Sequence, residues 1–168
     1  AKQQALRQWR VEDSMELYGI GTWGAGYFNI SENGEVVVSP HGRSGPQIPL
    51  LEVIAGLRER GYDMPVLLRV ENILSSRIAK IHESFRKAIK ELGYKGEYRG
   101  VFPIKVNQQQ QVVDKIAQFG ARYHHGLEVG SKAELIAAVS LMHDTEACIV
   151  CNGYKDAEFI DLGLWAKR

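Results

Sequence analysis

Three polar residues, Lys105, Glu128 and Asn152, each follow an apolar run of strand-like composition. Glu128 comes 23 positions after Lys105, and Asn152 comes 24 positions after Glu128. A lysine amine can attack a carbonyl group, and a neighbouring carboxylate can orient it. The regular spacing predicts that the three residues occupy corresponding points of consecutive βα units, on the inner face at the carboxyl ends of the strands. βα-barrels keep their chemistry at that end.

Each of these residues also has a structural interpretation that the sequence leaves open. Lys105 can extend its stem along a strand tip and place its ammonium group in solvent. Glu128 can pair with a surface lysine, and Asn152 can form a turn with Gly153. The common register favours one shared site over three separate explanations.

The stretch Arg99–Asn107 carries the lysine and alternates as a strand does. One face is wholly apolar and consists of Phe102, Ile104 and Val106, while Lys105 lies on the other. A helix-like run from Gln108 follows. A strand and a helix in this order predict a βα unit.

Other candidate positions have simpler interpretations. Ser131 and Glu134 have the spacing of a capping box before an apolar run, and the sequence leaves open whether capping is their only role. The pair His124–His125 has no third ligand at suitable spacing, so loop histidines are expected and not a metal site. Cys148 and Cys151, three apart in a predicted strand, suit neither a disulfide nor a metal chelate.

Helical and strand-like patterns alternate after Pro49, which predicts an α/β fold with a parallel sheet. Strands are expected over Pro65–Val70, Arg99–Asn107, Gly126–Val129 and Ala147–Cys151. Helices are expected from Leu50 to Gly61, from Asn72 to Gly93, around Val112–Phe119, around Leu135–Met142 and from Asp156. Before Pro49, Asn33-Gly34 predicts a hairpin between Tyr27–Ile30 and Glu35–Val38, followed by a loop over 39–49.

Composition narrows the class of protein. The 168 residues hold 21 Lys and Arg against 20 Asp and Glu, so electrostatics imply neither a nucleic-acid nor a membrane partner. No apolar run is long enough to span a membrane and no signal-peptide pattern opens the chain. Two cysteines favour a reduced, cytoplasmic protein. The absence of an initial Met and the helix-like end at Lys167-Arg168 predict a piece of a longer protein.

Three stretches, Val101–Gln108, Gly126–Leu135 and Ile149–Asp156, closely resemble biosynthetic arginine decarboxylases. Tyr18–Phe28 resembles the start of the same enzymes. These are pyridoxal-phosphate enzymes with an alanine-racemase-like barrel, related to ornithine and diaminopimelate decarboxylases. A glycine pattern over residues 19–24 matches a dinucleotide-binding motif, but no strand precedes it.

The resemblance implies a cofactor-binding set within this chain. Lys105 would form the Schiff base with pyridoxal 5'-phosphate, and Glu128 and Glu134 match acidic positions beside the cofactor. Ser131 and Asn152 belong to the same set. The resemblance also implies magnesium, although no motif in this sequence would ligate it.

The resemblance also implies a fold and an activity. The expected fold is a partial (β/α)8 TIM-like barrel over residues 49–168, preceded by residues 1–48 as part of a second β-domain completed downstream. The activity would be conversion of L-arginine to agmatine and CO2 in polyamine biosynthesis, by a homo-oligomer. This chain alone is expected to be inactive.

Three alternatives remain open at this point, the last of them a nucleotide-binding module at the glycine pattern of residues 19–24. A decarboxylase of another basic amino acid would share Lys105. A non-catalytic relative would keep the barrel without turnover.

Overall fold

The computed structural model describes residues 8–42 and 45–167. The chain divides into two compact units, Ala1–Ile73 and Leu74–Arg168. The division falls in the first turn of helix α4 (Glu71–Leu92), whereas the sequence suggests a boundary between residues 48 and 49. That boundary refers to the domains of a complete protein and stays a prediction.

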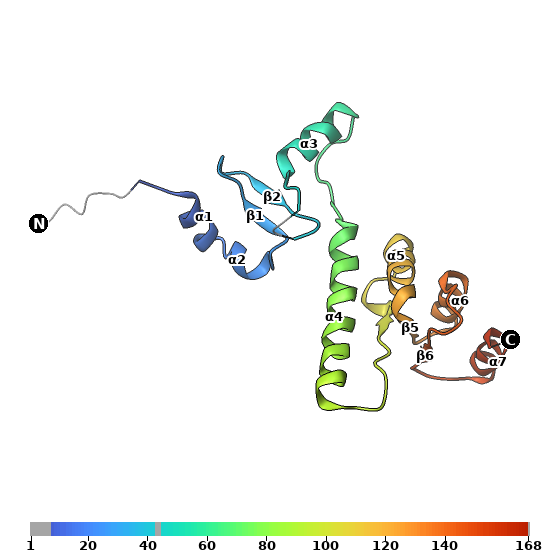
Figure 1. Ribbon diagram of the computed structural model, residues 1–168. Helices are drawn as coiled ribbons and strands as arrows, with labels where there is room; N and C mark the ends of the chain where they lie inside the picture. The colour runs from blue at the N-terminus through green and yellow to red at the C-terminus, as the bar shows by residue number, and fades with distance from the viewer. Residues whose placement is uncertain (1–7, 43–44, 168) are drawn as a thin grey trace, which may run out of the picture. The chain divides into compact units, whose positions relative to one another are not determined.

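The described residues of the first unit form three helices and a small antiparallel sheet (Figure 1). The helices are α1 (Val11–Leu17), α2 (Ile20–Trp23) and α3 (Leu50–Glu59). Strands β1 (Phe28–Ile30) and β2 (Val36–Val38) form the predicted hairpin, which is confirmed. A third strand, β3 (Ile48–Pro49), pairs with β2 at the end of the segment predicted as a loop.

The strand predicted over Pro65–Val70 is wrong, since the structure has no strand there. Leu67 is 73% exposed and Leu68 is 40% exposed. An apolar run becomes a buried strand only where a neighbouring strand and a covering layer exist. This segment has neither among the described residues.

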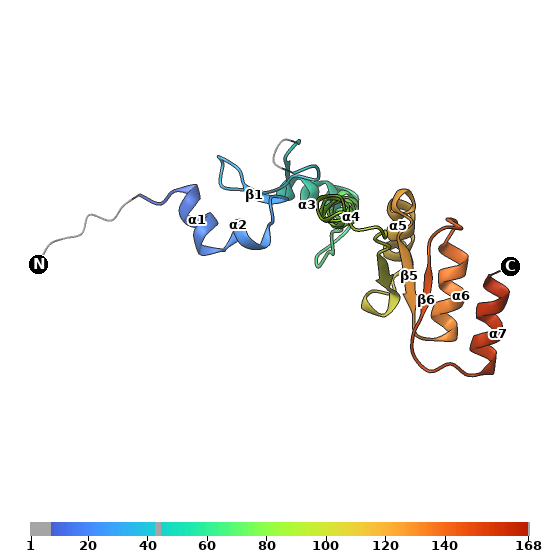
Figure 2. The same cartoon turned by 60° about the horizontal axis from the view of Figure 1, so that its bottom comes forward.

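The second unit alternates helices with parallel strands, which confirms the predicted α/β class (Figures 1 and 2). Its strands are β4 (Val101–Pro103), β5 (Gly126–Val129) and β6 (Ile149–Cys151), in that order across the sheet. After α4 come helices α5 (Gln110–Gly120), α6 (Lys132–Leu141) and α7 (Ala157–Ala166), one after each strand.

The two faces of this sheet differ. Leu127 and Val129 of β5 are fully buried on the helix-covered face. Their apolar neighbours in the core come from α4 to α7 and include Ile78, Val113, Ile116, Leu135, Ala138 and Phe159. Burying one such aliphatic side chain contributes about 1.5–3 kcal/mol, so this face stabilises the unit. Alternation along β5 directs Glu128 to the opposite face.

No helix in the described part of the chain combines the length and apolar character needed to cross a membrane.

Candidate functional site

Lys105 lies in a turn at the end of β4, not in the strand itself. The strand ends at Pro103, and Ile104–Val106 form one short 3-10 turn, η1, closed by the Asn107 N–H donating to the Ile104 carbonyl at 3.0 Å. The prediction of a strand through Asn107 is therefore wrong at this end. Ile104 is buried while Val106 is 69% exposed, because the turn breaks the alternation of side chains.

The turn brings the Lys105 amine to the predicted carboxylate. Lys105 Nζ lies 3.8 Å from Glu128 Oε1, with side chains that are 67% and 7% exposed respectively. The backbone of Glu128 is fixed in the central strand between buried Leu127 and Val129. A rigidly held, buried carboxylate thus faces an amine that solvent and small molecules can reach.

Asn152 completes this group from the next strand. Its Nδ2 donates to Glu128 Oε1 at 2.9 Å, and its backbone N–H donates to the Val129 carbonyl at 2.8 Å. The sheet ladder therefore fixes the position of Asn152, and Asn152 in turn orients the Glu128 carboxylate. The predicted meeting of Lys105, Glu128 and Asn152 is confirmed as geometry.

The register of the three residues differs in detail from the prediction. Glu128 pairs with Pro103 on one side and Val150 on the other, so Lys105 and Asn152 each lie two residues further along. For Asn152 a shift of two preserves the side of the sheet, because side chains alternate with period two, and the η1 turn brings Lys105 to the same side. The three side chains therefore still converge at the carboxyl edge, meaning the end of the sheet where β4, β5 and β6 finish.

Ser131 and Glu134 lie at the same edge, at the start of α6. Ser131 Oγ accepts from the Glu134 N–H at 3.2 Å, which confirms Ser131 as the N-cap. The Glu134 carboxylate accepts from the Gly130 N–H at 2.6 Å and from Gln108 Nε2 at 3.3 Å. Sequence reasoning missed Gln108, which ties the segment after Lys105 to the loop after β5.

Two other lysines near the carboxyl edge are already held by hydrogen bonds. Lys132 Nζ donates to Asp156 Oδ2 at 2.9 Å and to Glu158 Oε2. These bonds, to Glu158 first and then to Asp156, raise the pKa of Lys132 and keep it protonated. Lys155 Nζ donates to the Gly153 carbonyl at 3.0 Å. Lys105 lies instead beside the buried Glu128 carboxylate that Asn152 orients, so Lys105 is the better candidate.

Both residues of the histidine pair lie in the loop before β5, as predicted. His124 lies in the turn before β5, and its Nδ1 is 2.9 Å from Asp144 Oδ2. His125 is also in this loop but is buried, which the sequence did not indicate, and its Nδ1 is 2.9 Å from Nε2 of His82. The signal for His82 was its place four residues after Ile78, on the buried face of α4.

Within residues 8–42 and 45–167, no group of three or more His, Cys, Asp or Glu side chains could hold a metal ion. Cys148 and Cys151 are both free thiols.

Comparison with known families gives one match over half of the chain. The model for the pyridoxal-binding domain of pyridoxal-dependent decarboxylases matches residues 78–165. This range contains all five candidate residues, from Lys105 to Asn152.

Curated relatives resemble nearly the whole chain. A biosynthetic arginine decarboxylase of Prochlorococcus marinus (strain MIT 9303) is 45% identical over 98% of this chain and 26% of its own length. That of Gloeobacter violaceus is 44% identical over 97% of this chain and 25% of its own length. The chain thus spans about a quarter of the length of these relatives.

A solved structure shares the fold. The crystal structure of the biosynthetic arginine decarboxylase SpeA from Campylobacter jejuni is 40% identical, with a TM-score of 0.80. The match covers 89% of this chain and 24% of that one.

Proposed function

Because the chain belongs to the pyridoxal-dependent decarboxylases, we propose that it is part of an arginine decarboxylase. The complete protein would convert L-arginine to agmatine and CO2 in polyamine biosynthesis. The observation that carries this proposal is the 45% identity to a biosynthetic arginine decarboxylase over 98% of the chain. The contact between Lys105 and Glu128 at the carboxyl edge supports it independently.

The second unit would form the first part of a (β/α)8 barrel. Three parallel strands in chain order, each followed by a helix, are consistent with such a barrel, as is the polar inner face that carries Glu128. The antiparallel sheet of the first unit would belong to a separate β-domain, completed by the rest of the protein.

The residues at the carboxyl edge fit pyridoxal 5'-phosphate chemically. Lys105 offers an exposed amine, which is the group needed to hold the cofactor's aldehyde carbon. Glu128, oriented by the Asn152 amide, would keep that amine at the sheet edge and stabilise its positive charge. When bound, the cofactor supplies an electron sink for the electrons of the bond broken when CO2 leaves.

Ser131 and Glu134 would act indirectly, by holding the start of α6 and the segment after Lys105 in place. Ser131 caps the helix, and Glu134 holds Gly130 and Gln108 together. Both residues would therefore shape the rim of the cofactor site. The homo-oligomeric state and any need for magnesium are parts of this proposal that rest on the resemblance alone, and the cytoplasmic location rests on the two cysteines.

The test is an activity assay on the complete protein loaded with cofactor. Arginine, ornithine and lysine are supplied separately, and amine products are quantified. We expect agmatine from arginine and at least tenfold slower turnover of the other two. Preference for ornithine or lysine would overturn the substrate assignment, and absence of any amine product would overturn the proposed activity.

A further inference from the structure

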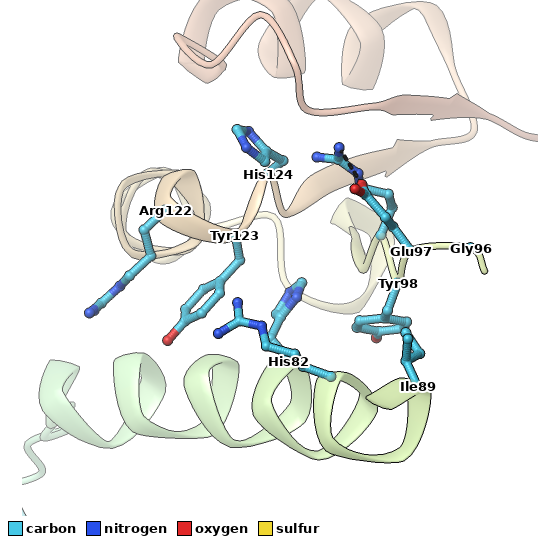
Figure 3. Close-up of a pocket in the computed structure, with 10 residues that line it drawn as sticks. His82, Ile89, Gly96, Glu97, Tyr98, Arg122, Tyr123 and His124 are labelled. Carbon is cyan, nitrogen blue, oxygen red and sulfur yellow. Dashed lines mark hydrogen bonds and ion pairs between the residues drawn. The ribbon is translucent and has the colours of Figure 1, made fainter. Parts of the chain in front are cut away.

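A pocket of about 390 Å³ lies at the amino edge of the parallel sheet, where β4 and β5 begin (Figure 3). Helix α4 forms one wall, and the segments that enter β4 and β5 form the others. The site around Lys105 lies at the opposite edge. The pocket is therefore separate from the proposed cofactor site, and its capacity to bind a ligand does not depend on the proposed function.

Two arginines of the pocket share one aromatic ring. The guanidinium carbons of Arg86 and Arg122 lie 5.8 and 5.4 Å from the centre of the Tyr123 ring. Arg122 Nη2 also donates to Ser75 Oγ at 3.4 Å. Among the described residues, neither guanidinium has a carboxylate within ion-pair distance.

The acidic side chains near the pocket already have cationic or ring partners. Glu97 accepts from Arg99 Nη2 at 2.8 Å. Asp144 and Glu146 lie 2.9 and 3.6 Å from the two ring nitrogens of His124. The positive charges of Arg86 and Arg122 are thus the ones left without a carboxylate in this pocket.

The floor of the pocket is rigid. Tyr123 stacks on His82 with ring centres 4.7 Å apart and an interplanar angle of 11°. Tyr98 packs edge-on against His82 at 5.0 Å. Because His82 is buried and bonded to His125, the ring that positions both arginines is itself fixed.

We propose that this pocket binds a small oxyanion with more than one phosphoryl or carboxylate group. A guanidinium presents N–H donors in a planar fork that matches such groups, and it is weakly hydrated. The volume exceeds what one phosphate fills, and two separate guanidinium groups favour an anion with two charged ends. Tyr98 and Tyr123 would provide an aromatic wall for the part between them.

The experiment titrates inorganic pyrophosphate into the complete protein by calorimetry. The protein is loaded with its cofactor beforehand, so that a phosphate site at the carboxyl edge is already filled. Sodium chloride at the same ionic strength serves as the blank. We expect saturable binding with one site per chain, which weakens as salt is added because the contacts are between charges.

Variants identify the site. Arg86→Gln and Arg122→Gln should each weaken binding about tenfold or more, since each removes a charge-assisted contact. Arg86→Lys keeps the charge but loses the fork, so its affinity should be intermediate. Arg77→Gln, an exposed arginine on the same helix outside the pocket, is the matched control and should change affinity less than twofold.

Both arginines are exposed, so the variants should fold, and equal unfolding midpoints would verify this. Absence of saturable binding to the wild-type protein would overturn the proposal. So would binding that survives both pocket substitutions, or an effect of Arg77→Gln as large as theirs, which would indicate general attraction to net charge.

Discussion

The two edges of the parallel sheet use the same strands for opposite purposes. At the carboxyl edge, a buried carboxylate faces an exposed amine, and the Lys105 side chain reaches solvent. At the amino edge, two histidines are buried against each other and covered by tyrosine rings. The first arrangement leaves a reactive group accessible, whereas the second fills space around α4.

Glycines explain why the amino edge packs so closely. A Cβ atom at Gly100 would lie 2.7 Å from His125 Nδ1, and one at Gly120 would lie 2.7 Å from His125 Cβ. Both distances are shorter than ordinary van der Waals contact. The His125 ring can therefore reach His82 only because residues 100 and 120 have no side chain. This difference agrees with the general division in βα folds, where the carboxyl edge carries chemistry and the amino edge carries stability.

Substitution of Lys105 should have the largest effect on the carboxyl edge. Lys105→Ala in the complete protein removes the amine proposed to hold the cofactor, so turnover of arginine should fall below detection. Lys155→Ala, which removes a lysine bonded to a backbone carbonyl at the same edge, is the control and should stay active. Equal activity in both variants would remove the distinction drawn between these amines.

A smaller loss is expected for the carboxylate. Glu128→Gln keeps the shape and an acceptor for Asn152 but removes the charge next to Lys105. We expect kcat/KM to fall about 10- to 100-fold, because the substitution removes a buried negative charge 3.8 Å from Lys105 Nζ. The unfolding midpoint should change little. A loss of stability without a loss of turnover would make Glu128 a structural residue.

The amino edge should respond to acid. Burial, and secondarily the charge of His82, lower the pKa of His125 from 6.5 to about 4. Burial, with Arg86 second, lowers the pKa of His82 as well. A histidine with a lowered pKa binds protons preferentially in the unfolded chain. Its contribution to stability is complete above about pH 6.5 and is lost as the pH falls toward about 4.

Denaturant titrations at pH 7 and pH 5 measure this contribution. Between pH 7 and pH 5, the free energy of unfolding should fall by about 2 kcal/mol more for the wild-type protein than for His125→Asn. This difference follows from the lowering of the His125 pKa to about 4. The exposed His143, replaced by Asn, is the control and should alter the pH profile less than His125→Asn does. Parallel pH profiles for wild type and His125→Asn would contradict a buried neutral pair.

The smallest effect is expected at the α6 cap. Ser131→Ala removes the acceptor of the Glu134 N–H and should cost about 1 kcal/mol in the free energy of unfolding. Ser140→Ala, in the same helix, loses only a bond to the Ala137 carbonyl and should change stability by less than about 0.5 kcal/mol. Similar values for the two variants would argue against the cap.

Most helices and strands of the second unit could be predicted from the sequence, because the periodicity of apolar residues and the helix caps depend on residues close together in the chain. β5 spans the predicted residues, and the predicted Asp156 start of the last helix is its N-cap. The η1 turn was not predictable from the sequence, since apolar and polar residues keep alternating through Lys105 and Val106. In the structure the Asn107 N–H donates to the Ile104 carbonyl, and these residues form a turn in place of a strand. The strand expected over Pro65–Val70 failed because periodicity shows an apolar run and not whether a partner strand exists.

Long-range side-chain contacts were the least predictable feature. The regular spacing of Lys105, Glu128 and Asn152, one βα repeat apart, predicted that they would meet, because consecutive parallel strands place corresponding residues side by side. The contact between His82 and His125 joins residues 43 positions apart on unlike elements, and no period relates them.

Chemical trapping of the cofactor would show whether Lys105 is the lysine that holds it. The complete protein is incubated with pyridoxal 5'-phosphate, reduced with borohydride, digested and mapped by mass spectrometry. We expect a stoichiometric pyridoxyl label on Lys105. A stoichiometric label on Lys132, Lys155 or any other lysine, with Lys105 unmodified, would contradict it.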